Sequence, residues 1–132
     1  MTSAPTERIH HYQTRSAESA REMEVLFESE YFQGAADRAY YAVFHLTQAL
    51  LASEGLEYNS HEAVIAAFGR EFAKTKRIDP KYHKILRQAF DLRLTADYDV
   101  EVSIDQETAQ DLISSCRDFL QTIGAYLGRT NP

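Results

Sequence analysis

Residues 34–53 carry the sequence GAADRAYYAVFHLTQALLAS, and this stretch decides the fold. When it is placed on a helix at about 100° per residue, apolar side chains occupy almost every side. A helix that is apolar nearly all round is typical of the buried centre of a helical protein. We therefore predict a central helix over about residues 31–54, surrounded by the other helices of the chain.

One narrow stripe of polar residues interrupts the apolar surface of this helix. Burying an arginine or a histidine costs free energy unless the group is paired or faces a wet cleft. We expect Arg38, Tyr41 and His45 to point inward at spacings of about one helical turn. The whole stripe consists of Asp37, Arg38, Tyr41, His45 and Gln48.

Four further helices are predicted from apolar residues that recur at spacings of three and four. Asn59 is expected to cap the third helix, because asparagine is a favoured N-cap residue. The connections are short, so neighbouring helices should run antiparallel, and we predict an all-α, up-and-down bundle of about five helices. The four further ranges are about Thr6–Ser29, Ser60–Lys74, Pro80–Asp97 and Asp105–Leu127.

The composition is that of an ordinary globular domain. Of the 132 residues, 44% are hydrophobic and 26% are charged, which suits a single domain over residues 1–132 with one sizeable core. We expect residues 129–132 to form a frayed tail. The net charge of −6 argues against broad, non-specific attraction to nucleic acids or membranes, although it permits a local basic patch.

Six basic residues form the one such patch, which is spread over a predicted loop and one face of the fourth helix. A solvated surface is the simpler interpretation of a run of charges of this kind. The residues are Lys74, Lys76, Arg77, Lys81, Lys84 and Arg87.

The single cysteine indicates whether a disulfide can form, and the N-terminal sequence indicates where in the cell we expect the protein. Cys116 cannot form an internal disulfide, and its place on an apolar helix face predicts a core thiol. No apolar run reaches membrane-spanning length, and the N-terminal residues MTSAPTERIHH lack the apolar region of a signal peptide. We therefore expect a cytoplasmic protein without membrane association.

Polar residues also fall on the apolar faces of the third and fourth helices. His61 lies in the first turn of the third helix, and Arg93 lies in the middle of the apolar face of the fourth. Asp97 follows Arg93 by one turn, where the two can pair, and Tyr98 follows at the helix end. We expect all four residues to lean inward.

Each of these residues also has a structural interpretation. Arg93 with Asp97 is most simply an ion pair that ties the end of the helix to the bundle. His61 is more often a satisfied core histidine or a cap partner than a catalyst. Tyr41 could pack in the core with its hydroxyl reaching the surface.

Arg38 and His45 lie seven residues apart on one ridge of the central helix, and structural and functional interpretations are both open for them. Histidine suits proton transfer near neutral pH, and arginine is a fixed cation that can stabilise a phosphorane. Together they could cleave RNA without a metal. The sequence has no His-Glu-x-x-His motif and no glycine-rich phosphate loop, so we expect no metal site and no cofactor.

Three segments of the chain carry a resemblance to a known family. They are YFQGAADRAYYAVFHLTQALLASEG at residues 31–55, NSHEAVIAAFGREF at 59–72 and RLTADYD at 93–99. Together they resemble the small stand-alone HEPN proteins of prokaryotes, a branch once filed as an uncharacterised UPF group. The resemblance covers roughly residues 19–99.

This resemblance implies an all-helical bundle, usually dimeric, that is often encoded beside a minimal nucleotidyltransferase as a toxin–antitoxin pair. Many members are metal-independent ribonucleases that carry an arginine followed, after about four to six residues, by a histidine. In dimers this motif typically faces its symmetry mate across a shared cleft. Arg38 and His45 match the motif and are thereby implied as catalytic residues. The residues expected to bind or support are Tyr41, His61, Arg93, Asp97 and Tyr98.

The resemblance also leads us to expect a homodimer, a minimal nucleotidyltransferase as partner, and RNA or a nucleotide as ligand. Gly34, on the same face as Arg38, would let the backbone of a second copy approach closely. The commonest active form of the motif has a polar residue directly after the arginine and often a tyrosine two residues after the histidine. Ala39 and Thr47 occupy those positions here.

Three interpretations of the polar stripe therefore stay open. The first is a ribonuclease toxin that uses Arg38 and His45. The second is a non-catalytic helical subunit that binds a nucleotidyltransferase or a nucleotide, with the stripe giving the interface its specificity. The third is a structural bundle in which the polar residues form internal hydrogen bonds.

Overall fold

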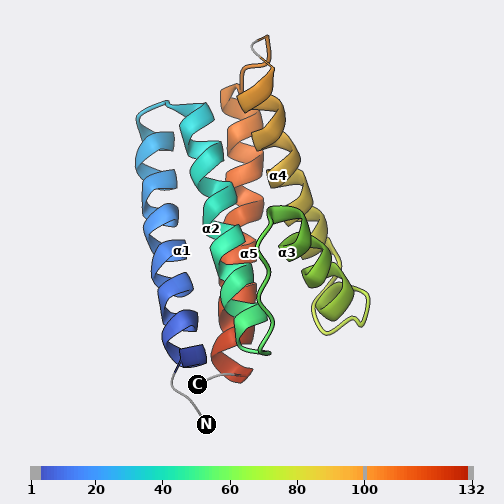
Figure 1. The fold of residues 1–132 in the computed structure, drawn as a ribbon. Coiled ribbons are helices and arrows are strands. Elements are labelled where there is room, and N and C mark those ends of the chain that lie inside the picture. Colours follow the sequence, from blue (N-terminus) through green and yellow to red (C-terminus); the bar gives the residue numbers. More distant parts are fainter. Residues whose placement is uncertain (1–3, 100, 131–132) are drawn as a thin grey trace.

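The computed structural model describes residues 4–99 and 101–130, and these residues form five α-helices and one π-helical turn (Figure 1). The described residues contain no strand, so the prediction of an all-α bundle is confirmed. The elements are α1 (Ala4–Glu28), α2 (Phe32–Ala52), α3 (His61–Phe68), the π-helical turn η1 (Gly69–Ala73), α4 (Lys81–Tyr98) and α5 (Gln106–Thr130).

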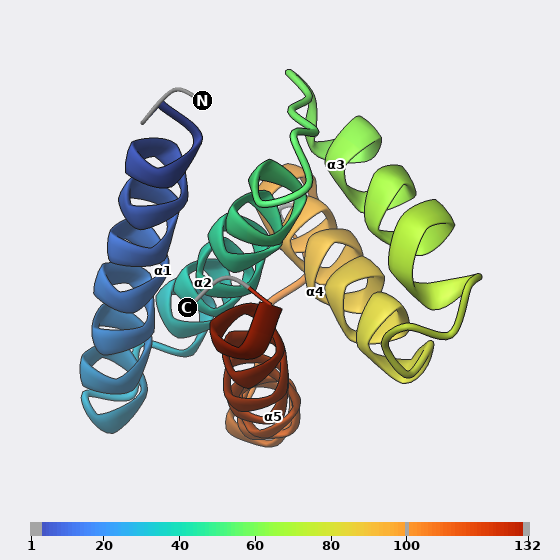
Figure 2. The same cartoon turned by 90° about the horizontal axis from the view of Figure 1, so that it is seen from below.

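Four long helices run alternately up and down the bundle, in the order α1, α2, α4 and α5 (Figure 1). The short helix α3 lies beside α4 and also contacts α2. In the end-on view, α2 lies at the centre with α1 on one side and α3 on the other (Figure 2). The antiparallel arrangement follows from the short connections, as expected from the sequence.

Helix α2 is the centre of the hydrophobic core, because α1, α3, α4 and α5 all pack against it. Fourteen of its 21 residues are buried, and Tyr40 and Leu50 are among the largest fully buried side chains of the described residues. Although α2 is apolar on most sides, neither it nor any other described helix is long and apolar enough to cross a membrane.

The third predicted helix changes its winding at Gly69. There the backbone amide of Lys74 donates to the carbonyl of Gly69 at 2.8 Å, five residues back, which is the hydrogen bond of a π-helical turn. The ring of His83 lies so close that a Cβ atom on Gly69 would be 2.7 Å from its Nε2 atom. Glycine at this position therefore lets the His83 side chain of α4 lie directly against η1.

Two local expectations need correction. Ser60, and not Asn59, caps α3, because its hydroxyl accepts a hydrogen bond from the Ala63 amide at 3.1 Å. Helix α5 continues past the predicted end at Leu127 to Thr130, while residues 131–132 of the predicted tail lie outside the described residues. A Cβ atom on Gly34 would meet the Leu26 side chain of α1 at 3.4 Å, an ordinary contact distance, so packing within the chain does not require glycine here and its place in a dimer stays a prediction.

The central position of α2 makes a prediction about stability. Leu50→Ala should lower the free energy of unfolding by about 2–5 kcal/mol, because the side chain is fully buried and its removal leaves a cavity. The control is Val25→Ala on α1, where the side chain is 62% exposed and the change should stay within about 0.5 kcal/mol. Urea denaturation measures both, and similar losses in the two variants would contradict the central position of α2.

Candidate functional site

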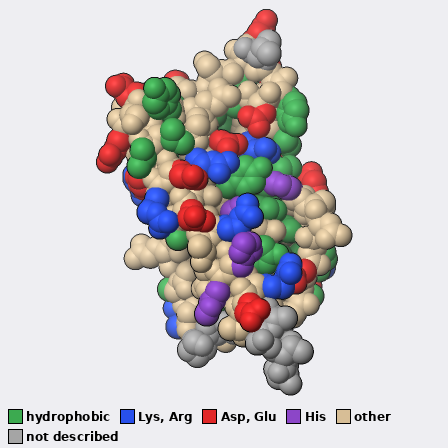
Figure 3. All heavy atoms as spheres, turned by 60° about the vertical axis from the view of Figure 1, so that its left-hand side comes forward, with side chains coloured by type: hydrophobic (Ala, Val, Ile, Leu, Met, Phe, Trp, Pro, Cys, Tyr) green, Lys and Arg blue, Asp and Glu red, His purple; other side chains and the backbone are tan. Residues whose placement is uncertain are grey.

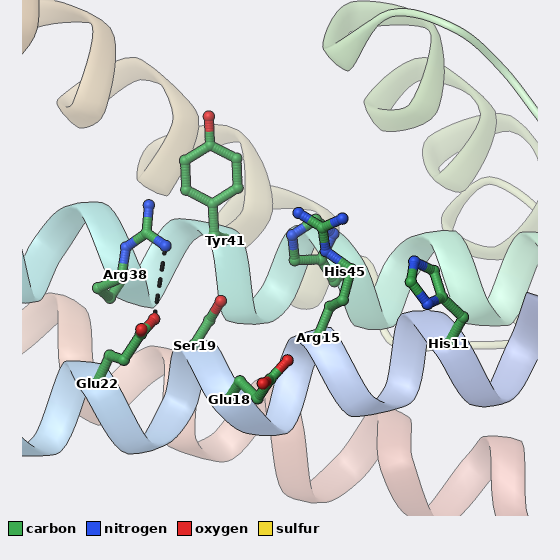
Figure 4. A pocket seen from close by; sticks show the side chains of 8 residues that line it. All are labelled: His11, Arg15, Glu18, Ser19, Glu22, Arg38, Tyr41 and His45. Carbon is green, nitrogen blue, oxygen red and sulfur yellow. Dashed lines mark ion pairs between the residues drawn. The ribbon is translucent and has the colours of Figure 1, made fainter.

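A groove runs between α1 and α2 along the polar stripe of the central helix (Figure 4). Its volume is about 540 Å³. Figure 3 shows basic, acidic and histidine side chains gathered together across the middle of this face of the molecule. The groove is lined by Arg38, Tyr41 and His45 from α2 and by His11, Arg15, Glu18, Ser19 and Glu22 from α1.

The stripe therefore lines a groove that is open to solvent, so Arg38 and Tyr41 point into this groove and not into the dry core of the bundle. Both side chains are partly exposed, and His45 alone of the three is buried. The hydrophobic residues on the other sides of α2 take the buried positions, which leaves the polar stripe on the side that the neighbouring helices cover least.

Helix α1 supplies the wall of the groove that sequence reasoning missed. Small side chains let the two helices approach, and the buried hydroxyl of Ser16 donates to the carbonyl of Ala42 on α2 at 2.7 Å. A weak signal for this wall exists in the sequence. His11, Arg15 and Glu22 follow one another at spacings of four and seven residues beside the apolar face of α1, so they lie on one side of the helix.

Asp37 holds two arginines from different helices together. Its carboxylate accepts from Arg38 Nη2 at 2.7 Å and from Arg93 Nε of α4 at 3.0 Å. Both guanidinium groups also lie over the ring of Tyr41, with their central carbons 4.8 and 5.0 Å from its centroid. Each contact is a cation–π geometry, so Asp37 and Tyr41 together fix both cations at the edge of the groove.

Outer carboxylates complete this cluster. Glu22 of α1 lies 3.5 Å from Arg38 Nη1, and Asp97 lies 3.6 Å from Arg93 Nη2, one turn further along α4. The structural interpretation of Arg93 with Asp97 as an ion pair agrees with this geometry. Arg93 reaches Asp37 at a shorter distance, however, so its principal partner is on α2 and was not expected.

His45 is held as a neutral, oriented imidazole. Its side chain is buried, at 8% exposed, and Nδ1 lies 2.8 Å from Gln48 Oε1. Burial is the main cause that lowers the pKa of His45; the hydrogen bond with Gln48 opposes it, and the nearby cations Arg15 and Arg38 add to the lowering. When Nδ1–H donates to the Gln48 oxygen, Nε2 carries the lone pair and is the nitrogen that can accept a proton.

His61 is placed at the edge of the core and not in the groove. Its Nδ1 atom lies 2.6 Å from the hydroxyl of Tyr40, and its ring stacks on Phe44 with centroids 4.3 Å apart. Burial raises the pKa of Tyr40, so its hydroxyl is the donor, and burial lowers the pKa of His61. This is the geometry of a satisfied histidine, and it supports the back of α2 behind Tyr41.

The end of α4 does not contribute to the groove. Tyr98 is 81% exposed and points away from the bundle, so the expectation that it leans inward is wrong. Asp97 reaches the site only through Arg93. Cys116 is fully buried, and burial raises its pKa to about 12, as a core thiol requires. Among the described residues, no group of three or more histidine, cysteine or acidic side chains could hold a metal ion.

Comparison with known proteins decides the family. The family described as "HEPN domain" matches residues 11–126, which include the groove and its arginine and histidine. The chain belongs to the HEPN domain family. The resemblance stated from the sequence is thereby confirmed, and it extends to most of α1 and α5, beyond the segments that first suggested it.

Relatives in this family come from bacteria and archaea. A UPF0332 protein of Thermotoga maritima is 34% identical over 115 residues, which cover 87% of each chain. A protein of Methanocaldococcus jannaschii that is named a "putative toxin" is 32% identical over 113 residues, covering 86% of this chain and 77% of the relative. A UPF0332 protein of Gloeobacter violaceus is 30% identical over 87% of this chain and 92% of its own.

The lowered pKa of His45 predicts that acid destabilises the fold. Because the folded state binds fewer protons than the unfolded state, stability is full above the ordinary histidine pKa of about 6.5 and falls as the pH drops below it. His45→Gln, which cannot be protonated, should lose less stability than the natural protein between pH 7.5 and pH 5.5. Urea unfolding at both pH values measures this, and an equal loss in the two proteins would contradict a buried, neutral His45.

Proposed function

We propose that this HEPN protein is a toxin that cleaves RNA without a metal ion, with Arg38 and His45 as its catalytic residues. One observation carries the proposal. His45 is a buried, neutral imidazole whose Nδ1 is fixed by Gln48, and it lines an open groove together with Arg38. An oriented neutral histidine beside a fixed cation is what general-base cleavage of a phosphodiester needs.

In the proposed reaction, Nε2 of His45 takes the proton of a 2′-hydroxyl, and that oxygen attacks the adjacent phosphorus. Negative charge then grows on the phosphoryl oxygens, where Arg38 can neutralise it. The bond from phosphorus to the 5′-oxygen breaks, and that oxygen receives a proton from the imidazolium. The products are a 2′,3′-cyclic phosphate and a free 5′-hydroxyl, so protons and electrons balance without a further reactant.

The cations of the groove are well arranged for this role. Arg38 is tied to Asp37 at 2.7 Å, but its contact with the exposed Glu22 is longer, at 3.5 Å, and an RNA phosphate could replace Glu22 there. Arg15 on the opposite wall adds a second positive charge. Tyr41 and Arg93 are positioning residues in this proposal, because they hold the Arg38 guanidinium through stacking and through Asp37.

The name given to the archaeal relative supports the toxin part of this proposal. The family resemblance leads us to propose in addition that the chain forms a homodimer and pairs with a minimal nucleotidyltransferase. In such a dimer, the Arg38 and His45 motifs of the two copies would face one another across a shared cleft.

A second candidate function is a non-catalytic subunit that binds a partner protein or a nucleotide through the same groove. It is favoured by the carboxylates of Glu18, Glu22 and Asp37, which offset the charge of Arg15 and Arg38. A groove that carries both signs of charge suits an interface with a protein better than it suits an RNA backbone.

The ribonuclease proposal predicts a specific pattern of loss. His45→Ala and Arg38→Ala should each remove most of the cleavage of a short RNA, and the double variant should be little worse than either single one. The matched control Arg129→Ala removes an exposed cation at the far end of α5 and should retain activity. Gel assays with purified protein measure cleavage, which should survive EDTA and should stop when the 2′-hydroxyl is replaced by a methoxy group.

Two outcomes would contradict the ribonuclease. One is intact RNA after incubation with the purified protein across a wide pH range, together with normal growth of cells that express the chain alone. The other is cleavage that persists in both His45→Ala and Arg38→Ala. The first result would favour the partner-binding or nucleotide-binding subunit, and the second would point to a contaminating nuclease.

A further inference from the structure

The basic patch noted in the sequence divides into two groups in the structure. Three of its six cations are paired with acids on other helices or loops, and the other three have no ion pair with any described residue. The pairs are Arg77 with Glu54 at 2.9 Å, Lys81 with Asp118 at 3.8 Å and Arg87 with Glu62 at 2.8 Å. The cations without such a pair are Lys74, Lys76 and Lys84.

Two of these cations line a hollow of about 520 Å³ between η1 and the start of α4. Arg70 and His83 add basic groups to its wall, although Arg70 is partly neutralised by Glu71 at 3.1 Å. None of the eight lining residues is acidic, in a chain whose net charge is −6. The lining residues are Ala66, Gly69, Arg70, Ala73, Lys74, Lys76, Pro80 and His83.

The backbone around this hollow is fixed in an unusual shape. Lys76 has a φ of 60°, a left-handed conformation that glycine or asparagine adopts more easily than lysine. The turn is closed by hydrogen bonds from the Lys76 amide to Ala73 and from the amide of buried Ile78 to Phe72, at 3.0 and 3.1 Å. The π-helical turn η1 forms the opposite wall, and such turns are frequent at functional sites. The closed turn therefore holds the backbone of Lys76 in this strained conformation at the rim of the hollow.

We propose that this hollow binds the phosphate group of a phosphate ester, held between the ammonium groups of Lys74 and Lys76. The hollow lies on the side of the bundle away from α1, with α2 between them, so it is separate from the groove of Arg38 and His45 (Figure 2). The phosphate can come from a free mononucleotide or from the backbone of a nucleic acid strand. Either source presents phosphate oxygens to the two lysines. The phosphate of a mononucleotide carries up to two negative charges, and a backbone phosphate carries one.

Binding by two probes tests this site without any need for cleavage. The probes are AMP, followed by calorimetry, and a fluorescent 2′-O-methyl oligonucleotide, followed by anisotropy at several salt concentrations. The test variant is the double substitution Lys74→Gln with Lys76→Gln. The control is Lys81→Gln with Lys84→Gln, which removes the same charge from residues of α4 that do not line the hollow. A folded far-UV CD spectrum is checked for each.

We expect the test variant to lose binding of at least one probe, while the control retains it. For the oligonucleotide, the slope of log affinity against log salt should fall by about 0.7 for each phosphate that the variant no longer neutralises. Loss of AMP binding alone identifies a mononucleotide as the source, and loss of oligonucleotide binding alone identifies a strand. Neither result depends on whether the protein cleaves RNA, so this site and the proposed ribonuclease can fail separately.

A third variant separates the charge of Lys76 from its conformation. Lys76→Gly removes the ammonium group and relieves the left-handed strain, so it should raise the melting temperature while it weakens probe binding. The phosphate site is overturned if neither probe binds the natural protein, or if the test and control variants lose binding equally. It is also overturned if Lys76→Gly leaves binding of both probes unchanged.

Discussion

The burial of helix α2 on nearly every side controls both the fold and the position of the groove. Each large apolar side chain removed from water contributes about 1.5–3 kcal/mol, whereas a charged group buried without a partner costs several. With α1, α3, α4 and α5 packed around it, α2 can turn only one narrow face toward solvent. Beyond its first turn, the partly exposed residues of α2 are Asp37, Arg38, Tyr41 and Gln48, and all four belong to the polar stripe.

The chemistry of the groove depends on two environments along α2, one that holds compensated arginines and one that holds a buried, neutral histidine. At one end, Asp37 compensates two arginines and the ring of Tyr41 contacts both of them, so the cations are oriented before any ligand arrives. One turn further on, His45 is buried against Gln48 and stays neutral, because both burial and the neighbouring cations lower its pKa. A fixed cation and a neutral base thus share one groove, which is the basis of the proposed cleavage.

The central helix and its stripe were predictable because both depend on the local period of 3.6 residues. The partners of the stripe were not, since they depend on contacts between residues far apart in the sequence. Arg93 reaches Asp37 across 56 positions, and the Ser16 contact that brings α1 to the groove spans 26. Tyr98 was misplaced for a different reason. It lies in the last turn of α4, where helical periodicity no longer decides which side is covered.

The turn at Gly69 is another feature that could not be predicted from the local sequence. The sequence of this region favours a continuous helix, whereas the structure has a π-helical turn where His83 of α4 lies against Gly69. The basic patch was also visible in the sequence, but its division into paired and unpaired cations depends on acids supplied by other elements, such as Asp118 of α5. Tertiary packing therefore decided which charges are compensated, while local pattern decided where the helices lie.

The most direct test of the account is the pH dependence of kcat/KM for cleavage of a short RNA, measured beside an NMR titration of the His45 ring. In the free enzyme, kcat/KM reports the pKa of the essential base. We predict an acidic limb at the pKa that NMR gives for His45, below the ordinary value of about 6.5. A protein that cleaves no RNA at any pH, or an acidic limb that does not coincide with the titration of His45, would contradict the account.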